Sequence, residues 1–256
     1  MGPHLESSKN LKNCYFYHSV DLPDGRKLAG EWDLRDGIEE YLGRVDFRGK
    51  RVLDVGAANG FLSFSIEKRG AKEIISFDLD PDGEWDVVPY AGMDFQSWLQ
   101  SRKAHIGKLN NGYWYCHRAF KSKAKLLHGT VYDLPPDIGK VDIAVVGSIL
   151  LHLRDPWTAL RNILAITRET VIIVEKLPRR YLPLKYFRKL DVPWITFLPD
   201  SRRHDPIDGW WILTPSAIRR MIGVLGFQES RVTFHKQPLQ GKKQQLFTVV
   251  GSRTHP

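Results

Sequence analysis

The chain has 256 residues and a formal net charge of +9, and 42% of its residues are apolar and 26% charged. This length and balance are ordinary for a globular protein with a substantial core, in one large domain or two small ones. No run approaches the roughly 18 apolar residues of a membrane span, and residues 1–10 lack the apolar centre of a secretory signal. We therefore expect no membrane partner.

The two cysteines and the basic residues restrict the function only weakly. Neither Cys14 nor Cys116 stands in a CxxC pair or near histidines at metal-ligand spacing. We therefore expect no disulfide framework, no metal site and a reducing, cytoplasmic compartment. The excess of Lys and Arg favours an anionic partner such as RNA, but these residues are scattered, and a well-solvated surface explains them equally well.

Residues 1–46 precede the first regular alternation of apolar patterns. They combine aromatic residues with turn signals such as Pro23-Asp24-Gly25, and residues 34–45 carry apolar side chains at helical spacing. We interpret residues 1–46 as an N-terminal, partly helical segment that folds over the site as a lid.

From residue 51 onward, apolar β-branched runs alternate with amphipathic helical patterns. The predicted strands are 51–55, 73–79, 125–129, 141–149 and 170–176, and the predicted helices among them are 60–70 and 155–167. Asp155 and Pro156 give the second helix an N-cap and a proline at its first position. This alternation predicts a parallel sheet with helices on both faces.

The last part of the chain has a different pattern. Residues 214–227 are a predicted helix capped by Thr214, and 230–236 and 244–252 are predicted strands joined by a polar turn at 237–242. They form an antiparallel hairpin at the sheet edge. The predicted fold class is therefore α/β: a single domain, 1–256, with a mostly parallel seven-stranded sheet.

Two connections are long for a compact domain and rich in aromatic and basic residues. They are residues 84–123 and 177–213. We interpret both as insertions that cover the carboxyl ends of the strands, where an open α/β sheet binds its ligands and where they form the acceptor side. Ordinary packing helices are the alternative.

The first predicted strand ends in an acid and a glycine turn, Asp54-Val-Gly56-Ala-Ala58-Asn-Gly60-Phe61. A dinucleotide fingerprint needs glycine at positions 58 and 61, and a carboxylate at 54 would repel a pyrophosphate. Asp78 ends the second strand, where an acid binds two ribose hydroxyls. A nucleoside with an amine, a sulfonium and no phosphates fits this set best. S-adenosylmethionine is such a molecule, and a nicotinamide cofactor fits worse.

Residues 52–60, VLDVGAANG, resemble the first motif of class I S-adenosylmethionine-dependent methyltransferases, and residues 129–164 resemble their later motifs. The similarity covers residues 47–175 and implies a Rossmann-like fold, S-adenosylmethionine as cofactor and methyl transfer. Residues 15–85 resemble a mostly uncharacterised subgroup. Its relatives include the transferase that completes the modified wobble uridine of tRNA, and others are uncharacterised small-molecule methyltransferases.

The resemblance implies which residues hold the cofactor. Asp54 is expected to hold the methionine amine, directly or through water, Asp78 the ribose hydroxyls, and Leu79 the adenine. The other implied cofactor-binding residues are Gly56, Ala57, Ala58, Gly60, Thr130, Val131, Gly147 and Ser148. Ala58 replaces a family glycine, a mild change if its φ stays negative. Thr130 replaces the usual adenine-binding carboxylate, so a hydroxyl or a backbone carbonyl is expected to meet the adenine amine.

Methyl transfer is an in-line displacement that needs alignment, and it needs a base only if the acceptor keeps its proton until late. Our candidates for that base are His152 after the fourth strand, His18 in the N-terminal segment and Glu175 at the end of the fifth strand. Capping, core packing or a structural ion pair are the alternatives for these residues. The candidate acceptor-binding residues are Tyr17, Tyr113, Trp114, His117, Trp210 and Trp211, for which core packing is equally plausible.

The leading hypothesis is methyl transfer to a small or medium-sized acceptor, at oxygen first and at nitrogen second. The second is modification of RNA, such as a tRNA base, with S-adenosylmethionine or its carboxylated form. A third, from another class, is a cofactor-binding scaffold without chemistry.

Overall fold

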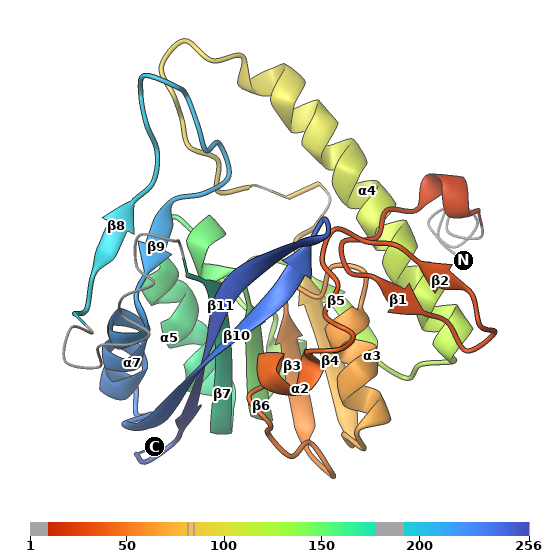
Figure 1. The fold of residues 1–256 in the computed structure, drawn as a ribbon. Helices are drawn as coiled ribbons and strands as arrows, with labels where there is room; N and C mark the ends of the chain where they lie inside the picture. Colours follow the sequence, from red (N-terminus) through yellow and green to blue (C-terminus); the bar gives the residue numbers. More distant parts are fainter. Residues whose placement is uncertain (1–9, 81, 84, 178–191, 256) are drawn as a thin grey trace.

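The computed structural model describes residues 10–80, 82, 83, 85–177 and 192–255. Its centre is a seven-stranded sheet in the order β10-β11-β7-β6-β3-β4-β5 (Figure 1). The strands are β3 (Arg51–Val55), β4 (Glu73–Asp78), β5 (Lys125–His128), β6 (Val141–Gly147), β7 (Thr167–Lys176), β10 (Glu229–Leu239) and β11 (Lys242–Ser252). Strands β3 to β7 pair in parallel, whereas β11 is antiparallel to β7 and β10. The predicted fold class is confirmed.

Helices cover both faces of this sheet (Figure 1). The helices are α2 (Ile38–Tyr41), α3 (Phe61–Lys68), α4 (Phe95–Phe120), α5 (Pro156–Ile166) and α7 (Pro215–Val224), with short 3-10 turns η1 (Leu11–Asn13), η2 (Pro136–Ile138) and η3 (Leu150–His152). The two predicted caps form, since Asp155 accepts a hydrogen bond from the Thr158 amide and Thr214 one from the Ala217 amide. None of the described helices has the length and apolar character that a bilayer crossing requires.

The strands are buried on both faces because successive side chains enter two different cores. Val52 packs with α3 and the second half of α4, for example, while its neighbour Leu53 packs with α5 and α7. This explains why these strands read as continuous apolar runs, and it leaves the strand tips as the place for polar chemistry.

The predicted helix over residues 34–45 is largely wrong. Only α2 is helical there, because Gly37 precedes it and Gly43, with φ +62°, ends it. Upstream, β1 (Val20–Asp21) and β2 (Lys27–Leu28) form a small hairpin around the predicted turn at Pro23-Asp24-Gly25. In its described part, residues 10–46, the N-terminal segment is therefore mostly irregular chain between short elements.

The predicted C-terminal turn over residues 237–242 is too long. The β10–β11 register continues to the pair Leu239–Lys242, so the turn is only Gln240-Gly241, with φ of 47° and 75°. Pro238 is tolerated inside β10 because that strand lies at the edge of the sheet, where one row of amides has no ladder partner.

The two predicted insertions differ in structure and in packing from one part to another. In the first, α4 extends past the edge of the sheet with its first half, whereas its second half packs in the core, where Tyr113 and Cys116 are fully buried. In the second, β8 (Ile195–Phe197) pairs with β9 (Trp211–Leu213), which the sequence patterns did not indicate. Residues 178–191 of the second insertion lie outside the described residues.

Candidate functional site

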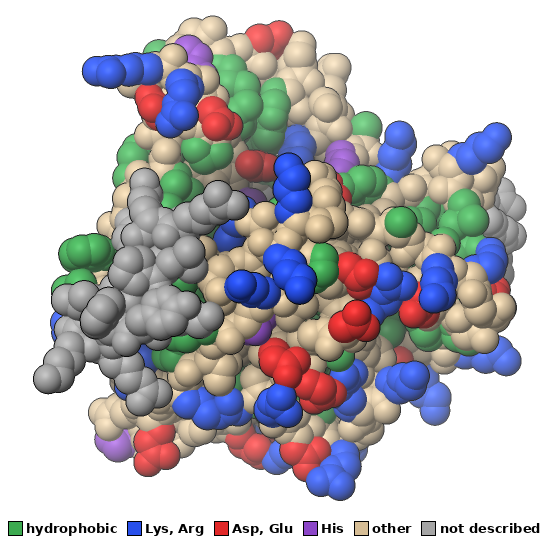
Figure 2. Space-filling view, in the orientation of Figure 1, with side chains coloured by type: hydrophobic (Ala, Val, Ile, Leu, Met, Phe, Trp, Pro, Cys, Tyr) green, Lys and Arg blue, Asp and Glu red, His purple; other side chains and the backbone are tan. Residues whose placement is uncertain are grey.

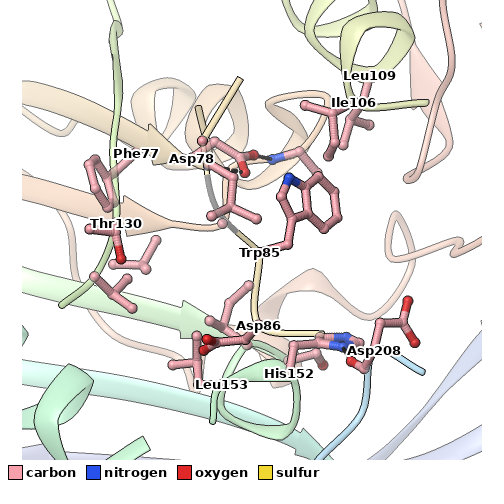
Figure 3. Close-up of a pocket in the computed structure, with 18 of the residues that line it drawn as sticks. Phe77, Asp78, Trp85, Asp86, Ile106, Leu109, Thr130, His152, Leu153 and Asp208 are labelled. Atoms are coloured by element: carbon pink, nitrogen blue, oxygen red, sulfur yellow. Dashed lines mark hydrogen bonds between the residues drawn. The ribbon is translucent and has the colours of Figure 1, made fainter. Parts of the chain in front are cut away.

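A cavity of about 820 Å³ lies at the carboxyl ends of β3, β4, β5 and β6. This volume is near the upper end of the range of about 300–1,000 Å³ that is usual for small-molecule sites. Its floor is made by the residues that follow these strands, and its walls by the N-terminal segment, the first half of α4 and the second insertion. In Figure 3, Trp85 lies between Asp78 on one side and Asp86 with His152 on the other.

The glycine turn after β3 uses the left-handed backbone region three times. Gly56, Ala58 and Gly60 have φ of 78°, 50° and 80°. The condition that Ala58 keeps a negative φ is therefore not met, and alanine occupies a conformation that favours glycine. Gly56 and Ala58 line the cavity, whereas Gly60 does not.

Replacing Ala58 by glycine is expected to raise the free energy of unfolding by about 0.5–1 kcal/mol. The left-handed conformation costs an alanine about 1–2 kcal/mol, which glycine avoids. Glycine loses more conformational entropy on folding than alanine, and this loss offsets part of the stabilisation. Urea unfolding measures this difference. The matched control is Ala57→Gly next to it, where φ is not positive and where stability should fall. A lower stability for Ala58→Gly would contradict the assignment of strain.

Asp78 ends β4 and faces the cavity. Its two carboxylate oxygens accept backbone hydrogen bonds from Ala58 at 2.6 Å and from Leu79 at 2.7 Å. Burial raises the pKa of this carboxyl, although the two backbone hydrogen bonds oppose the shift. A carboxylate has about four acceptor positions, so Asp78 still has capacity for two hydroxyl donors.

Asp54 does not line the cavity, so its carboxylate is not placed to contact a molecule there directly. It is fully buried beneath the glycine turn, where Ser63 Oγ donates to Oδ2 at 2.5 Å. The chain of hydrogen bonds continues from Ser63 Oγ to Ser76 Oγ, which also accepts a hydrogen bond from the hydroxyl of Tyr113 on α4. Burial raises the pKa of Asp54 to about 7, and Oδ1 has no hydrogen-bond partner among the described residues. Of the two expected ways in which Asp54 could hold the methionine amine, only the one through water is compatible with this position.

Gly60 and Ala57 also stand behind the cavity lining. A Cβ at Gly60 would lie 2.4 Å from the Phe64 ring and 2.9 Å from that of Tyr113. Glycine is therefore needed at this position for the packing of α3 and α4. The other expected cofactor residues do face the cavity, namely Leu79, Thr130, Val131, Gly147 and Ser148. Ser148 has φ of 53°, so strained non-glycine residues follow both β3 and β6 at the cavity.

His152 lines the cavity from η3, just after β6. Its Nδ1 lies within hydrogen-bond distance of the main-chain carbonyl of Asp208. A carbonyl oxygen can only accept, so Nδ1 carries the hydrogen and the neutral ring keeps its lone pair on Nε2. Nε2 is the atom at which His152 can take a proton.

His18 lines the cavity from the N-terminal segment and is almost fully buried. Its backbone amide donates to Asn59 Oδ1 at 2.8 Å, and Asn59 Nδ2 donates back to the His18 carbonyl at 3.0 Å. This reciprocal pair fixes the segment to the glycine turn. Burial lowers the pKa of His18 to about 4, so its ring is neutral near pH 7.

Glu175 does not reach the cavity, which corrects its assignment as a base at the site. It is 3% exposed, and its Oε1 accepts the amide of Leu150 at 2.9 Å. The Leu151 amide is a second donor, and burial raises the pKa of the Glu175 carboxyl to about 8. Glu175 therefore caps η3, the turn that carries His152. Register could not reveal this, because β7 is buried on both faces.

Of the six expected acceptor-binding residues, only Tyr17 lines the cavity. Tyr113, Trp114 and His117 lie on the second half of α4, which packs against the sheet. Trp210 and Trp211 instead use their indole N–H groups to bind the Asp86 and Arg154 carbonyls. Aromatic content was a poor guide here because aromatic side chains also build cores.

Several lining residues were not anticipated from the sequence. They are Glu31, Phe77, Trp85, Asp86, Arg102, His105, Tyr132 and Asp208. Contacts between the two insertions bring part of this set together, including the ion pair of Arg102 with Asp208 and the hydrogen bond of the Val88 amide with the Ile207 carbonyl. In the sequence, the one indication that these residues could line the site was the expected position of both insertions over this edge of the sheet. Within the described residues, no group of three His, Cys, Asp or Glu is arranged to bind a metal ion.

The sequence profile of a family described as "Methyltransferase domain" matches residues 26–228. The chain belongs to this family. The match spans the glycine turn, Asp78 and His152, and so includes the floor of the cavity. Together with the fold, it makes residues 26–228 a methyltransferase domain, which agrees with the motif resemblance.

Curated relatives match this methyltransferase only locally. The ribosomal protein L11 methyltransferase of Deinococcus radiodurans is 48% identical over 42 residues, and that of Mannheimia succiniciproducens is 45% identical over 42 residues. These matches cover 16% of the chain and only 15% and 14% of the relatives' own lengths.

Solved structures match over far more of the chain. The N-terminal domain of EvdMO1 with S-adenosylhomocysteine bound has a TM-score of 0.56 and 14% identity, covering 99% of this chain and 100% of that one. Magnesium protoporphyrin IX methyltransferase from Synechocystis PCC 6803, also with S-adenosylhomocysteine, has a TM-score of 0.50 and 13% identity, covering 84% and 80%. At these identities the likeness supports the fold.

The residues of this methyltransferase fit S-adenosylmethionine as its cofactor. Asp78 has free acceptor positions at the cavity surface, and no phosphate-binding glycine set surrounds it among the described residues. Gly56 brings bare backbone to the floor. The unpartnered Oδ1 of Asp54 lies behind the same turn, where an indirect contact would need it.

Proposed function

We propose that this methyltransferase acts on a small or medium-sized acceptor that binds inside the cavity, at an oxygen atom, with nitrogen as the second choice. The observation that carries the proposal is the enclosure of the cavity by three separate segments: the N-terminal segment, α4 and the second insertion. An acceptor that fits between these walls and the cofactor is limited in size.

The charges of the lining favour the same class of acceptor. Five carboxylates, on Glu31, Asp78, Asp80, Asp86 and Asp208, face two guanidinium groups, on Arg102 and Arg154. Such a lining repels the phosphates of a nucleic acid and favours acceptors that offer hydroxyl or amine donors. On the face drawn in Figure 2, the basic and acidic side chains of the described residues are interspersed.

S-adenosylmethionine supplies an electrophilic methyl group when it is bound. In our proposal Asp78 holds the ribose hydroxyls, and Leu79, Thr130 and Val131 surround the adenine. His152 takes the proton of the acceptor hydroxyl at Nε2, and neutral His18 contributes a hydrogen bond without adding charge. The walls of the cavity align the acceptor with the methyl group.

The resemblance of residues 15–85 to tRNA-modifying relatives makes tRNA the competing acceptor. A labelling experiment distinguishes a small acceptor from tRNA. The protein is incubated with S-adenosylmethionine that carries a tritiated methyl group, in one sample with a filtrate of small metabolites from a cell extract and in another with bulk tRNA. We expect label in the metabolite fraction and none in tRNA. Label in tRNA alone would overturn the proposal.

Replacing His152 by alanine is expected to reduce turnover of the labelled acceptor by about 10²–10⁴-fold, the usual contribution of a general base. Affinity for S-adenosylhomocysteine should change little, because Asp78 and the glycine turn remain. The transfer assay and calorimetry measure the two quantities. His255→Ala, an exposed histidine, is the control. Full turnover in His152→Ala would remove His152 from the chemistry.

A further inference from the structure

The tautomer of His152 depends on one carbonyl oxygen. Because Nδ1 donates to the main chain of Asp208, the proton-accepting atom is Nε2, and without that contact the ring is free to carry its hydrogen on Nε2 instead. Asp208 belongs to the second insertion and not to the central sheet. Main-chain hydrogen bonds hold its neighbours, from the Val88 amide to the Ile207 carbonyl and from the Trp210 amide to the Leu151 carbonyl, and the Asp208 side chain makes a further contact of its own.

The side chain of Arg102 on α4 makes the contact that fixes Asp208 from the cavity side. Arg102 Nη2 lies 2.5 Å from Asp208 Oδ2. The guanidinium also lies over two indole rings, 5.2 Å from the centroid of Trp85 and 5.5 Å from that of Trp98. These rings restrict the rotamers of Arg102, so the ion pair has a defined geometry.

This ion pair contributes little to global stability. The side chains of Arg102 and Asp208 are 31% and 40% exposed, so solvent screens their attraction. A contact with so small an energy can still decide the orientation of a loop carbonyl. Positioning of His152, and not folding, is the effect that its loss would show.

We propose that Arg102 is a positioning residue which, through its ion pair with Asp208, holds the Asp208 carbonyl against His152 Nδ1 and so keeps the lone pair of the ring on Nε2. This inference rests on the proposed role of His152 as the base. It adds a residue from each insertion to the machinery, and it explains why the two insertions meet beside η3.

The test is nuclear magnetic resonance of the histidine rings in the ¹⁵N-labelled full chain, which needs no acceptor. Long-range ¹H–¹⁵N spectra distinguish the two tautomers, and His152→Gln identifies the signals. We expect the Nδ1–H form in the wild type and its partial or complete loss in Arg102→Met, which keeps an unbranched side chain between the indoles. Asp208→Asn keeps the carbonyl but not the charge, and should show the same loss.

The matched control is Arg69→Met. It removes the ion pair of Arg69 with Glu39, whose side chains are 26% and 55% exposed, away from the cavity. Its His152 signals should remain those of the wild type. An Nε2–H tautomer in the wild type, or an unchanged Nδ1–H form in both Arg102→Met and Asp208→Asn, would overturn the inference. Failure of the proposed base role of His152 would appear elsewhere, as unchanged transfer by His152→Ala, and failure of the proposed function as label in tRNA alone.

Discussion

Replacing Asp78 by alanine is expected to weaken the binding of S-adenosylhomocysteine at least tenfold. A hydrogen bond to a charged group contributes about 1.5–3 kcal/mol, which corresponds to roughly 10–150-fold in affinity. The carboxylate is preorganised for this task, because the Ala58 and Leu79 amides hold both of its oxygens and leave the remaining lone pairs toward the cavity. Calorimetry with S-adenosylhomocysteine measures the change.

The control is Asp82→Ala, an exposed acid four residues further on that does not line the cavity. Its affinity should equal that of the wild type. Asp78→Asn keeps the size of the side chain, so a loss of affinity in a fully folded Asp78→Asn protein excludes misfolding as the cause. Wild-type affinity in Asp78→Ala would place the ribose elsewhere and refute the assignment of this edge of the sheet.

Asp54 provides a useful contrast. Direct contact of Asp54 with the cofactor would make the loss of affinity in Asp54→Ala as large as that in Asp78→Ala. Since Asp54 lies behind the glycine turn with Ser63, its replacement should affect stability as well as affinity. A comparison of calorimetry with urea unfolding for the variants of Asp54 and Asp78 therefore separates support of the turn from contact with the ligand.

Glutamine at position 175 is expected to flatten the pH dependence of stability. Burial raises the pKa of the folded Glu175 carboxyl to about 8 from its ordinary 4.5. Folding therefore favours the protonated form, and its stabilising contribution is complete below pH 4.5 and is lost as pH rises through 8. Over this window the wild type should lose roughly 3–5 kcal/mol from this one group. Asp54, raised to about 7, acts in the same direction.

Urea unfolding at half-unit steps from pH 4.5 to 8.5 measures this slope. Glu175→Gln keeps a carbonyl that can accept the Leu150 amide, so η3 should persist while the titration disappears. The free energy of unfolding of the variant, relative to that of the wild type, should increase steadily with pH. Glu229→Gln, at an exposed glutamate on β10, is the control and should run parallel to the wild type. Parallel curves for Glu175→Gln would mean that the carboxyl is not held protonated.

The local patterns of the sequence were enough to predict the central sheet. The boundaries of β3 were predicted to the residue, and the caps at Asp155 and Thr214 were read correctly. Both depend on interactions within a few residues. The failure at residues 34–45 has a local cause as well, in glycines that stop a helix, whereas the failure at 237–242 comes from the edge position of β10, which tolerates Pro238.

The side chains of the cavity were only partly predictable. Asp78 ends β4 and His152 lies on the short turn η3 after β6, so the register of a parallel sheet brings them to one edge. Trp85 and Arg102 come from a connection without a periodic pattern, and the orientation of such a connection depends on contacts with the other insertion. Glu175 lies near the end of β7, but the burial of this strand on both faces hides which side the carboxylate takes.

By itself, then, the amino-acid sequence determined the order of strands and helices, the acid–glycine–acid arrangement and the cofactor class, because each arises from neighbouring residues. Only the tertiary structure decided that Ala58 is left-handed, that Asp54 supports the turn from behind, and that Arg102 and Asp208 meet beside His152. These features depend on groups brought together from more than one part of the chain, and no spacing along the chain records the distance between such groups.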